Sequence, residues 1–456
     1  MPVLQFFAGT NLPLSWAELR SLKFGDDKRL GNTILVNTKQ DIKKIYSEYR
    51  FIGGSKRMGI VIAQVDLHKY ADLEQSHVDV VRFLTHFLHH VFTQDVNNLT
   101  AVMSSAKTSL AGVNFLDKEG IQALRTILQT IYTKAVTSLN PKFFNLNILA
   151  GADVTKALPE VSNLGHDVLK NLKDAGLKLK MLGSMHQLEK NTATSKKVLR
   201  NKGLEVNVTY DLSTKKVVIS VTIAVQDYDL WGRIEYKRPV RSMKVGMIPL
   251  KLAFIMLNLA RIKEGKGFWD PMAGLGTIVM AGLLKGAYSY GSDVDHRMVE
   301  AMKKNIAWMY EQGLVSKPLH RVFLFDIRKR PKTNKMLANI IRTGRFDAIV
   351  TEGYLGPRRY KPFRSKKHAM FWAKRVAMLN KQFLKNITSA VRVGGRVVFC
   401  MPIFTYAKKD GFGKLEVEPE INKNRFKVVK FRTGELVWSR KGAVVARKIH
   451  VLERIK

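Results

Sequence analysis

The chain has 456 residues, enough for two or three domains of ordinary size. It carries 77 Lys and Arg against 37 Asp and Glu, a formal net charge of +40. Because such an excess costs stability through self-repulsion, it indicates a polyanionic partner: nucleic acid first, an anionic membrane surface second, with generic solubility as the alternative to both.

The single cysteine, Cys400, excludes an internal disulfide and favours an intracellular protein. It stands in an apolar run, so we expect a small buried strand residue and not a catalytic thiol. The N-terminus has no basic region before its apolar stretch, and no apolar run reaches the roughly 18 to 20 residues that span a bilayer. We therefore expect a soluble, cytoplasmic protein that is not a membrane protein.

The first 75 residues predict a small α+β unit, with strands at 3–7, 33–36 and 59–63. An amphipathic helix is expected to begin at Leu14–Ser15. Ser15 is the expected N-cap because Glu18 follows it at the spacing of a capping box.

Residues 73–132 predict mostly helix, because apolar residues recur there at helical spacing. His86, His89 and His90 are expected to be surface or core histidines and not metal ligands. A second α+β unit with basic helices is expected to follow, with strands at 143–149, 177–182, 204–210 and 216–224 and helices at 165–174 and 186–201.

From residue 245, short apolar strands alternate with longer helical segments, which predicts a mostly parallel, doubly wound α/β sheet. Closing strands with a hairpin are expected between residues 426 and 452. The expected elements are strands ending at Asp270, Asp293, Asp326 and Thr351, a strand at 396–401, and helices after Gly276 and at 296–312, 332–343 and 367–391.

The clearest chemical signal is the segment 268–277, Phe-Trp-Asp-Pro-Met-Ala-Gly-Leu-Gly-Thr, in which a strand ends in an acid and a glycine loop opens a helix. The glycines allow a ligand close to the backbone, and the helix N-terminus favours polar or anionic groups. Asp293 is expected to bind a ribose hydroxyl, and Asp326 is the candidate to bind an adenine amine. The expected cofactor-binding residues are Asp270, Pro271, Met272, Ala273, Gly274, Gly276, Thr277, Asp293 and Asp326.

Two alternatives to a cofactor site remain for these strand ends. The acids could simply cap helices in an ordinary α/β domain. A dinucleotide oxidoreductase is disfavoured because the loop lacks the third glycine of GxGxxG.

The fourth strand is followed by the loop Thr351-Glu352-Gly353-Tyr354-Leu355-Gly356-Pro357, which should face the cofactor crevice. Glu352 is a candidate catalytic residue, since a carboxylate can accept a hydrogen bond, and later the proton, from an exocyclic amine. Tyr354 is the second candidate, because its ring can stack on a target base. The alternative is a capping Glu and a packed Tyr.

Residues 357–396 hold 12 Lys or Arg and no Asp or Glu, with Phe363, Phe371 and Trp372 among them. This mixture suits phosphate contact and base stacking, whereas the alternative is a solvated helix face with core aromatics. The expected RNA-binding residues are Arg358, Arg359, Lys361, Arg364, Lys366 and Lys367.

The motif Asp-Pro-x-x-Gly-x-Gly-Thr at 270–277, followed by this strand-four loop, resembles the THUMP-containing RNA methyltransferases. The group that modifies N2 of guanosine 10 in tRNA is the most similar. Further similarity lies at 7–19, 53–56, 226–253 and 437–449. The resemblance implies an N-terminal ferredoxin-like domain (1–75), a helical segment plus a THUMP-like RNA-binding domain (76–225), and a Rossmann-like methyltransferase domain (226–456).

The resemblance also implies S-adenosyl-L-methionine as cofactor, held by the residues given above, tRNA as partner, and no metal. The chain departs from the family in the catalytic loop. Glu352 stands where Asp is expected, Gly353 and Tyr354 where two prolines are expected, and Leu355 where the aromatic is expected. The prolines would stiffen the loop, whereas Gly353 loosens it.

The sequence therefore predicts an S-adenosylmethionine-dependent methyltransferase acting at guanine N2 in tRNA, by direct displacement with most of the catalysis from positioning. The alternatives are a DNA amino-methyltransferase and a non-catalytic RNA-binding protein that keeps the methyltransferase fold.

Overall fold

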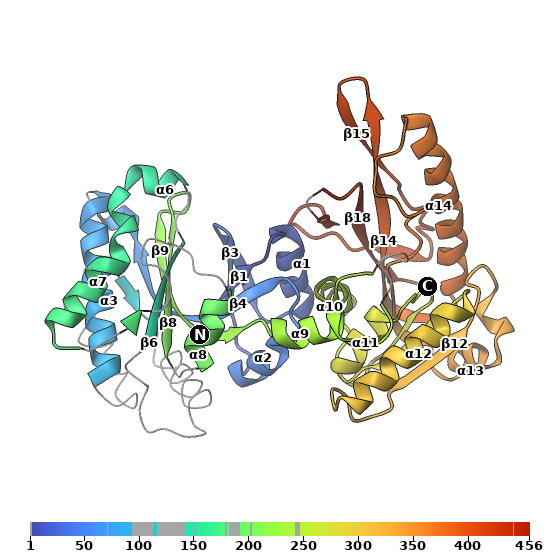
Figure 1. The fold of residues 1–456 in the computed structure, drawn as a ribbon, viewed down its shortest axis with the longest axis horizontal. Helices are drawn as coiled ribbons and strands as arrows, with labels where there is room; N and C mark the ends of the chain where they lie inside the picture. Colours follow the sequence, from blue (N-terminus) through green and yellow to red (C-terminus); the bar gives the residue numbers. More distant parts are fainter. Residues whose placement is uncertain are drawn as a thin grey trace. The chain divides into compact units, whose positions relative to one another are not determined.

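The computed structural model describes residues 2–70, 72–93, 113–115, 143–149, 152–177, 180–181, 192–200, 203–241, 247–440 and 442–456. They form two compact units, each with its own sheet (Figure 1). The first unit comprises residues 1–9, 23–50 and 55–226, and the second comprises 10–22, 51–54 and 227–456. Two short early segments of the chain thus belong to the second unit.

The first unit is built on one sheet with strand order β2-β3-β1-β4-β9-β8-β6-β7, and β5 pairs with β4. Its strands are β1 (Val3–Ala8), β2 (Asp26–Leu30), β3 (Thr33–Asn37), β4 (Ser55–Asp66), β5 (Val113–Phe115), β6 (Phe143–Leu149), β7 (Lys180–Met181), β8 (Leu204–Asp211) and β9 (Lys216–Val225). Its helices are α2 (Ile42–Tyr49), α3 (Leu73–Thr93), α6 (Ala152–Ala157), α7 (Leu164–Asp174) and α8 (Thr192–Arg200).

Most neighbours in this sheet are antiparallel, and strands from before and after residue 75 share it through the pairing of β4 with β9. Helices α3 and α7 pack side by side (Figure 1). Their facing side chains, among them Phe83, Phe87 and Leu172, are fully buried. The apolar periodicity that predicts α3 therefore marks its packed face.

The second unit is built on a mixed sheet with helices on both faces. Its strands are β10 (Gly267–Asp270), β11 (Tyr288–Asp293), β12 (His320–Leu324), β13 (Phe346–Thr351), β14 (Val391–Lys408), β15 (Gly411–Glu416), β16 (Phe426–Val428), β17 (Val437–Trp438) and β18 (Val445–Arg454). Its helices are α1 (Leu12–Leu22), α9 (Tyr228–Tyr236), α10 (Leu250–Leu259), α11 (Thr277–Leu284), α12 (His296–Glu311), α13 (Lys335–Thr343) and α14 (Lys366–Ile387).

The order of the second sheet is β12-β11-β10-β13-β14-β18-β16, and its first five strands are parallel. Strand β18 closes the sheet antiparallel to β14, and β15 forms a hairpin with the end of β14 that rises beside α14 (Figure 1). Strand β17 pairs antiparallel with β18, which is the closing hairpin expected between residues 426 and 452, whereas the β14–β15 hairpin was not predicted. The predicted doubly wound, mostly parallel sheet is confirmed.

Alternate side chains of the short parallel strands pack into two hydrophobic layers, one on each face of the sheet. Phe268 packs with α10, α11 and α12 on one face, whereas its neighbour Trp269 packs with α13 and α14 on the other. Both are fully buried, and burial of one such side chain contributes about 1.5 to 3 kcal/mol. This two-sided burial explains why β10 and β13 consist mainly of apolar residues.

The predicted start of the first helix is wrong. Helix α1 begins at Leu12, and the Asn11 side chain accepts a hydrogen bond from the Leu14 amide at 3.0 Å. Ser15 and Glu18 lie inside the helix and are buried. The Glu18 carboxylate instead accepts the amides of Gly53 and Gly54 at 2.8 and 2.6 Å, and burial raises its pKa to about 7. The capping-box spacing was thus a coincidence of two buried polar residues.

Several other expectations need correction or lie outside the described residues. Residues 113–115, expected to be helical, form a strand paired with β4. Of the strand expected at 177–182, the structure describes only the pair β7, and the helix expected at 186–201 is described as α8. Strand β12 ends at Leu324, two residues before Asp326. The expected helix beyond Thr93 falls outside the described residues, apart from β5.

Candidate active site

A pocket of about 760 Å³ opens in the second unit where the parallel strands β10 to β13 end. Ligands of doubly wound sheets bind at this edge, because the strand order reverses there and leaves a crevice. Among the residues that line it are Met247, Ile248, Asp270, Pro271, Met272, Ala273, Gly274, Thr277, Asp293, Asp295, Met298, Phe325, Asp326, Ile327, Arg328, Glu352, Gly353, Tyr354 and Leu379.

The glycine loop after β10 lines this pocket, and hydrogen bonds to the end of β11 hold it in place. Asp293 accepts the Gly274 amide at 2.9 Å, and the Ala273 amide donates to the Ser292 carbonyl at 2.9 Å. Gly276, expected to contact the cofactor, does not line the pocket. It has a φ of +84°, and a Cβ there would lie 2.5 Å from Met302 Cγ, so its part is to turn the chain into α11.

Asp270 is the most electrostatically perturbed group of the pocket. It is 2% exposed, and burial raises its pKa to about 8. The carboxylates of Asp293 and Glu352 raise it further, whereas hydrogen bonds from the Thr351 hydroxyl and the Met272 amide lower it. Three carboxyl groups around one cavity favour a ligand that carries positive charge.

Asp326, two residues after the end of β12, lines the pocket together with its neighbours Phe325 and Ile327. Its carboxylate forms an ion pair with Arg328 at 2.7 Å, and the hydrogen bonds from Arg328 lower its pKa. A ligand amine at this position would therefore share the Asp326 carboxylate with Arg328.

The loop after β13 brings Glu352 and Tyr354 into the same pocket as the strand-end acids. The Glu352 carboxylate forms an ion pair with Arg447 Nε at 2.5 Å. Gly353 has a φ of +74°, which a proline ring, fixed near −65°, cannot adopt. The loop thus follows a backbone path different from that of a Pro-Pro loop. The Tyr354 ring is 38% exposed at the pocket.

Sequence reasoning did not find Arg447 as part of the site. It lies on β18, 95 residues from Glu352, and meets it only because β18 pairs with β14 beside β13. No local motif could have indicated this pair. Met247 also lines the pocket and lies in the segment 226–253, whose resemblance to the family indicated a part of the chain that covers the cofactor. The apolar Met298 and Leu379 were missed, since single apolar residues in helices carry no distinctive pattern.

The six predicted RNA-binding residues lie between β13 and the first turn of α14, and none of them lines the pocket. All are exposed except Arg359, which is half-buried and donates to the carbonyls of Lys361 and Pro362. Phe363, expected among the stacking aromatics, is buried in the core, so that expectation is wrong. Tyr360, 76% exposed beneath the Arg358 guanidinium, is an accessible aromatic in its place.

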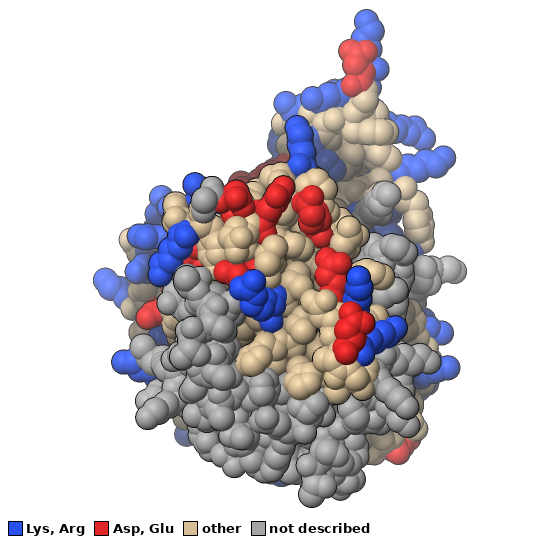
Figure 2. Space-filling model, turned by 90° about the vertical axis from the view of Figure 1, so that its left-hand side faces the viewer, with Lys and Arg blue, Asp and Glu red and all other residues tan. Residues whose placement is uncertain are grey.

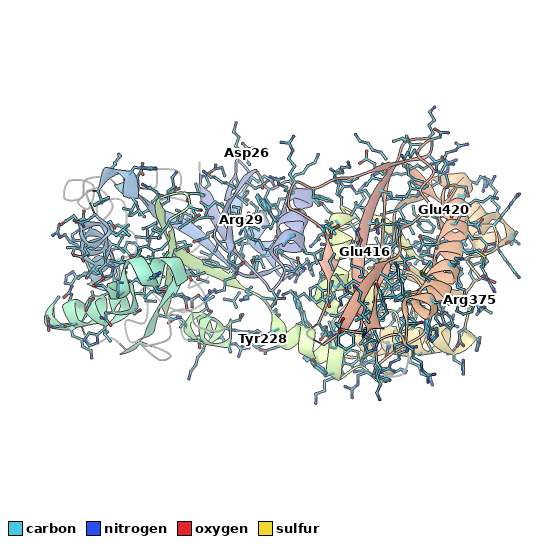
Figure 3. All side chains as sticks on the ribbon, turned by 90° about the horizontal axis from the view of Figure 1, so that it is seen from above. Asp26, Arg29, Tyr228, Arg375, Glu416 and Glu420 are labelled. Carbon is cyan, nitrogen blue, oxygen red and sulfur yellow. The ribbon has the colours of Figure 1, made fainter. Side chains whose placement is uncertain are left out.

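Helix α14 continues this surface, which we call the α14 surface: Arg358, Tyr360, Lys361, Arg364, Lys366, Lys367, Phe371 and Arg375. Arg375 (Figure 3) stacks on both Phe371 and Trp372 at 5.3 and 5.5 Å. Further along the helix, Lys381 pairs with Glu420 at 2.6 Å, so that end of the basic stretch is partly neutralised.

Positive charge is unevenly divided along the chain. Residues 227–456 carry 48 Lys or Arg and 18 Asp or Glu, which is +30 of the total +40. Figure 2 shows acidic and basic side chains mingled on the described part of a face of the first unit. The excess therefore resides mainly in the part of the sequence that contains the pocket.

Among the described residues, no three His, Cys, Asp or Glu side chains gather in a way that would hold a metal ion. His86 and His89 lie on α3, and the side chain of His90 falls outside the described part of the chain.

Of the helices that the structure describes, none carries an apolar stretch long enough to cross a membrane. Cys400 is fully buried on β14, as predicted.

Residues 238–317 match the family model described as "UPF0020: RMKL-like, methyltransferase domain". The chain is 27% identical over 129 residues to the tRNA (guanine(10)-N(2))-methyltransferase of Saccharomyces cerevisiae, which is 28% of this chain. It is 37% identical over 106 residues to the tRNA (guanine(10)-N2)-dimethyltransferase of Methanocaldococcus jannaschii, 23% of this chain. Each match spans only 28% of the relative's own length.

The crystal structure of TrmN from Thermus thermophilus aligns over 100% of both chains, with 15% sequence identity and a TM-score of 0.45. The family and sequence matches confirm the predicted resemblance to tRNA guanine-10 N2 methyltransferases as a similarity over part of the chain. The second unit carries a methyltransferase domain, and S-adenosyl-L-methionine is its cofactor. A pocket with acids for a sulfonium and the apolar Phe325 and Ile327 for an adenine fits that molecule.

Proposed function

We propose that the protein is an RNA methyltransferase that transfers the methyl group of S-adenosyl-L-methionine to an exocyclic amine, the N2 of guanine in tRNA. One observation carries the proposal: the pocket gathers the strand-end acids of the methyltransferase domain and the Glu352–Tyr354 loop around a single cavity. The names of the partial relatives support guanine N2 and tRNA.

Within this proposal, acids at three strand ends would hold the cofactor. Asp326 would accept the adenine amine between Phe325 and Ile327, and Asp293 would accept a ribose hydroxyl. Asp270 would lie at the methionine end, close to Glu352. When bound, the cofactor supplies a methyl group on a positively charged sulfur, which the surrounding carboxylates stabilise.

Glu352 is the proposed catalytic residue for the acceptor amine. Its carboxylate would accept an N–H hydrogen bond, which orients the nitrogen lone pair toward the methyl carbon. The bound cofactor would supply the methyl carbon to this nitrogen, with the electron pair of the carbon–sulfur bond left on sulfur, and Glu352 or water would take the amine proton. The ion pair with Arg447 fixes one carboxylate oxygen and leaves the other for the amine.

Tyr354 is the proposed platform for the target base, because its ring lines the pocket and remains 38% exposed. Stacking of a base on an aromatic side chain contributes about 1 to 3 kcal/mol. The α14 surface would contact the phosphates that flank the base. The predicted division at 75 and 226, with a THUMP-like RNA-binding part at 76–225, remains part of the proposal.

Mass spectrometry of the nucleosides of tRNA treated with the protein and cofactor tests this function. We expect a gain of N2-methylguanosine with the wild type and a much smaller gain with Glu352→Gln, which keeps the size of the side chain. Methylation of DNA but not RNA would favour a DNA amino-methyltransferase. Cofactor binding without any methylation would favour a non-catalytic RNA-binding protein.

A further inference from the structure

A buried arginine, Arg238, contacts two residues that line the pocket near the start of α11. Arg238 is only 3% exposed, although it lies just after α9 in a segment with exposed neighbours. Its Nη1 donates to the Thr277 hydroxyl at 2.8 Å, and its Nη2 contacts the Met247 sulfur. Thr277 and Met247 both line the pocket, so the guanidinium lies one side chain away from a bound ligand.

The charge of Arg238 has no carboxylate partner among the residues that the structure describes. The carboxylate of Glu235, whose charge raises the pKa of Arg238, instead accepts the Leu250 amide at 2.7 Å. Arg238 Nε has no hydrogen-bond partner. Burial lowers the pKa of the guanidinium to about 10. Burial of an unpaired cation lowers the stability of the folded protein, because the lost hydration of the charge is not replaced unless an anion lies nearby.

The start of α11 independently favours an anion at the same place. Thr277 is the first residue of this eight-residue helix, whose N-terminal amides carry partial positive charge. The same pocket is also lined by three acids, Asp270, Asp293 and Glu352. The cavity therefore offers both the partial positive charge of the α11 N-terminus and the negative charge of carboxylates, which suits a ligand that carries both signs.

S-adenosyl-L-methionine carries a sulfonium, an ammonium and one anionic group, the carboxylate of its methionine part. We infer that Arg238, together with the Thr277 hydroxyl, binds this carboxylate, and that Asp270 faces the ammonium. The pocket would thus distinguish the two charges of the amino acid. This inference rests on the methyltransferase domain and its cofactor, and not on the identity of the methyl acceptor.

Titration of the full-length protein with S-adenosyl-L-methionine and with decarboxylated S-adenosylmethionine, which lacks only the carboxylate, tests the inference by calorimetry. A charge-assisted hydrogen bond is worth enough to predict that the wild type prefers the intact cofactor by about tenfold to a hundredfold. Arg238→Met should weaken binding of the intact cofactor by about the same factor and leave binding of the decarboxylated one unchanged. Arg238→Lys should keep part of the preference.

Lys237→Met is the matched control, because it removes the neighbouring positive charge from an exposed side chain. It should leave both affinities unchanged. Equal weakening of both ligands by Arg238→Met would show a purely structural role and overturn the inference, and so would unchanged affinity. If Arg238→Met fails to fold, the wild type still decides, since equal affinity for the two ligands excludes a carboxylate contact. Failure of the proposed RNA methylation would appear separately, as a preserved preference without methyl transfer.

Discussion

The raised pKa of Asp270 makes a sharp prediction about cofactor binding. The folded protein without cofactor holds this carboxyl at a pKa of about 8, because it is buried next to two other carboxylates. A cationic cofactor favours the ionised form, so binding should release a proton at lower pH. Affinity for S-adenosyl-L-methionine should therefore rise as the pH increases toward 8 and level off above it, as far as Asp270 is concerned.

The size of the effect follows from the pKa. At pH 6, two units below about 8, roughly one molecule in a hundred carries an ionised Asp270. If only that form binds, affinity changes by up to about tenfold per pH unit, which is at most about 3 kcal/mol between pH 6 and pH 8. Asp270→Asn removes the titration and should abolish this part of the slope.

Calorimetric titration at several pH values, in two buffers of different ionisation enthalpy, measures both the affinity and the protons released. The amino group of the cofactor itself titrates at about 8, so the ratio of wild-type to Asp270→Asn affinity is the quantity to compare. We expect this affinity ratio to decrease as the pH is lowered from 8. At pH 6, the wild type should release close to one proton when it binds the cofactor. The same pH slope in both proteins would refute the assignment of Asp270 to the cationic part of the cofactor.

Four further predictions concern single residues or conditions. Asp293→Ala should weaken cofactor binding by at least about tenfold, since it removes both the expected ribose contact and the acceptor of the Gly274 amide; unchanged affinity in calorimetry would overturn the ribose assignment. Glu352→Ala should lower the turnover number about a hundredfold while cofactor and RNA affinities stay close to wild type, and surviving turnover would make Glu352 structural. Folding favours protonated Glu18, whose pKa is raised from 4.5 to about 7, so the free energy of unfolding should fall as pH rises across that range, by at most about 3 kcal/mol. Denaturant unfolding of Glu18→Gln should lack this pH dependence, and an equal dependence would contradict it. RNA affinity, measured by filter binding, should fall steeply with salt, and a flat dependence would count against the α14 surface.

The sequence predicts the methyltransferase sheet well because its strands are short, alternate with longer helical segments and stop at polar residues. Strands β10, β11 and β13 end at Asp270, Asp293 and Thr351, as expected. A strand buried on both faces leaves a plain signal, and an acid at its carboxyl end marks the edge where ligands bind. The same reasoning predicted Asp326 and Glu352 at this edge, and both line the pocket.

Features that depend on long-range pairing were not predictable in this way. Helix α10 is almost entirely buried, and its residues other than Lys251 and Asn258 are apolar, so it has no clear amphipathic period to detect. Strand β14 extends far beyond the predicted 396–401, since the hairpin with β15 continues it. Both the Glu352–Arg447 pair and the contact of α1 with α10 join distant segments that no local pattern connects.

The buried polar residues were the hardest to interpret from sequence. Glu18 suggested a helix cap, yet it holds the Gly53–Gly54 segment by two amide hydrogen bonds inside the second unit. Arg238 lies in the segment 226–253 that resembles the family, but its burial was not predicted, because a lysine-rich and arginine-rich chain does not reveal which of its cations is buried. In both cases the packing of the second unit, and not the residue type, determines the role.

Transfer of isotopically labelled methyl groups from S-adenosyl-L-methionine to tRNA, ribosomal RNA and DNA, offered in parallel, tests the central claim most directly. The account predicts label in tRNA, loss of that label with Asp293→Ala and Glu352→Ala, and none in DNA. Label in DNA alone, or no label in any nucleic acid while calorimetry shows the cofactor bound, would contradict it.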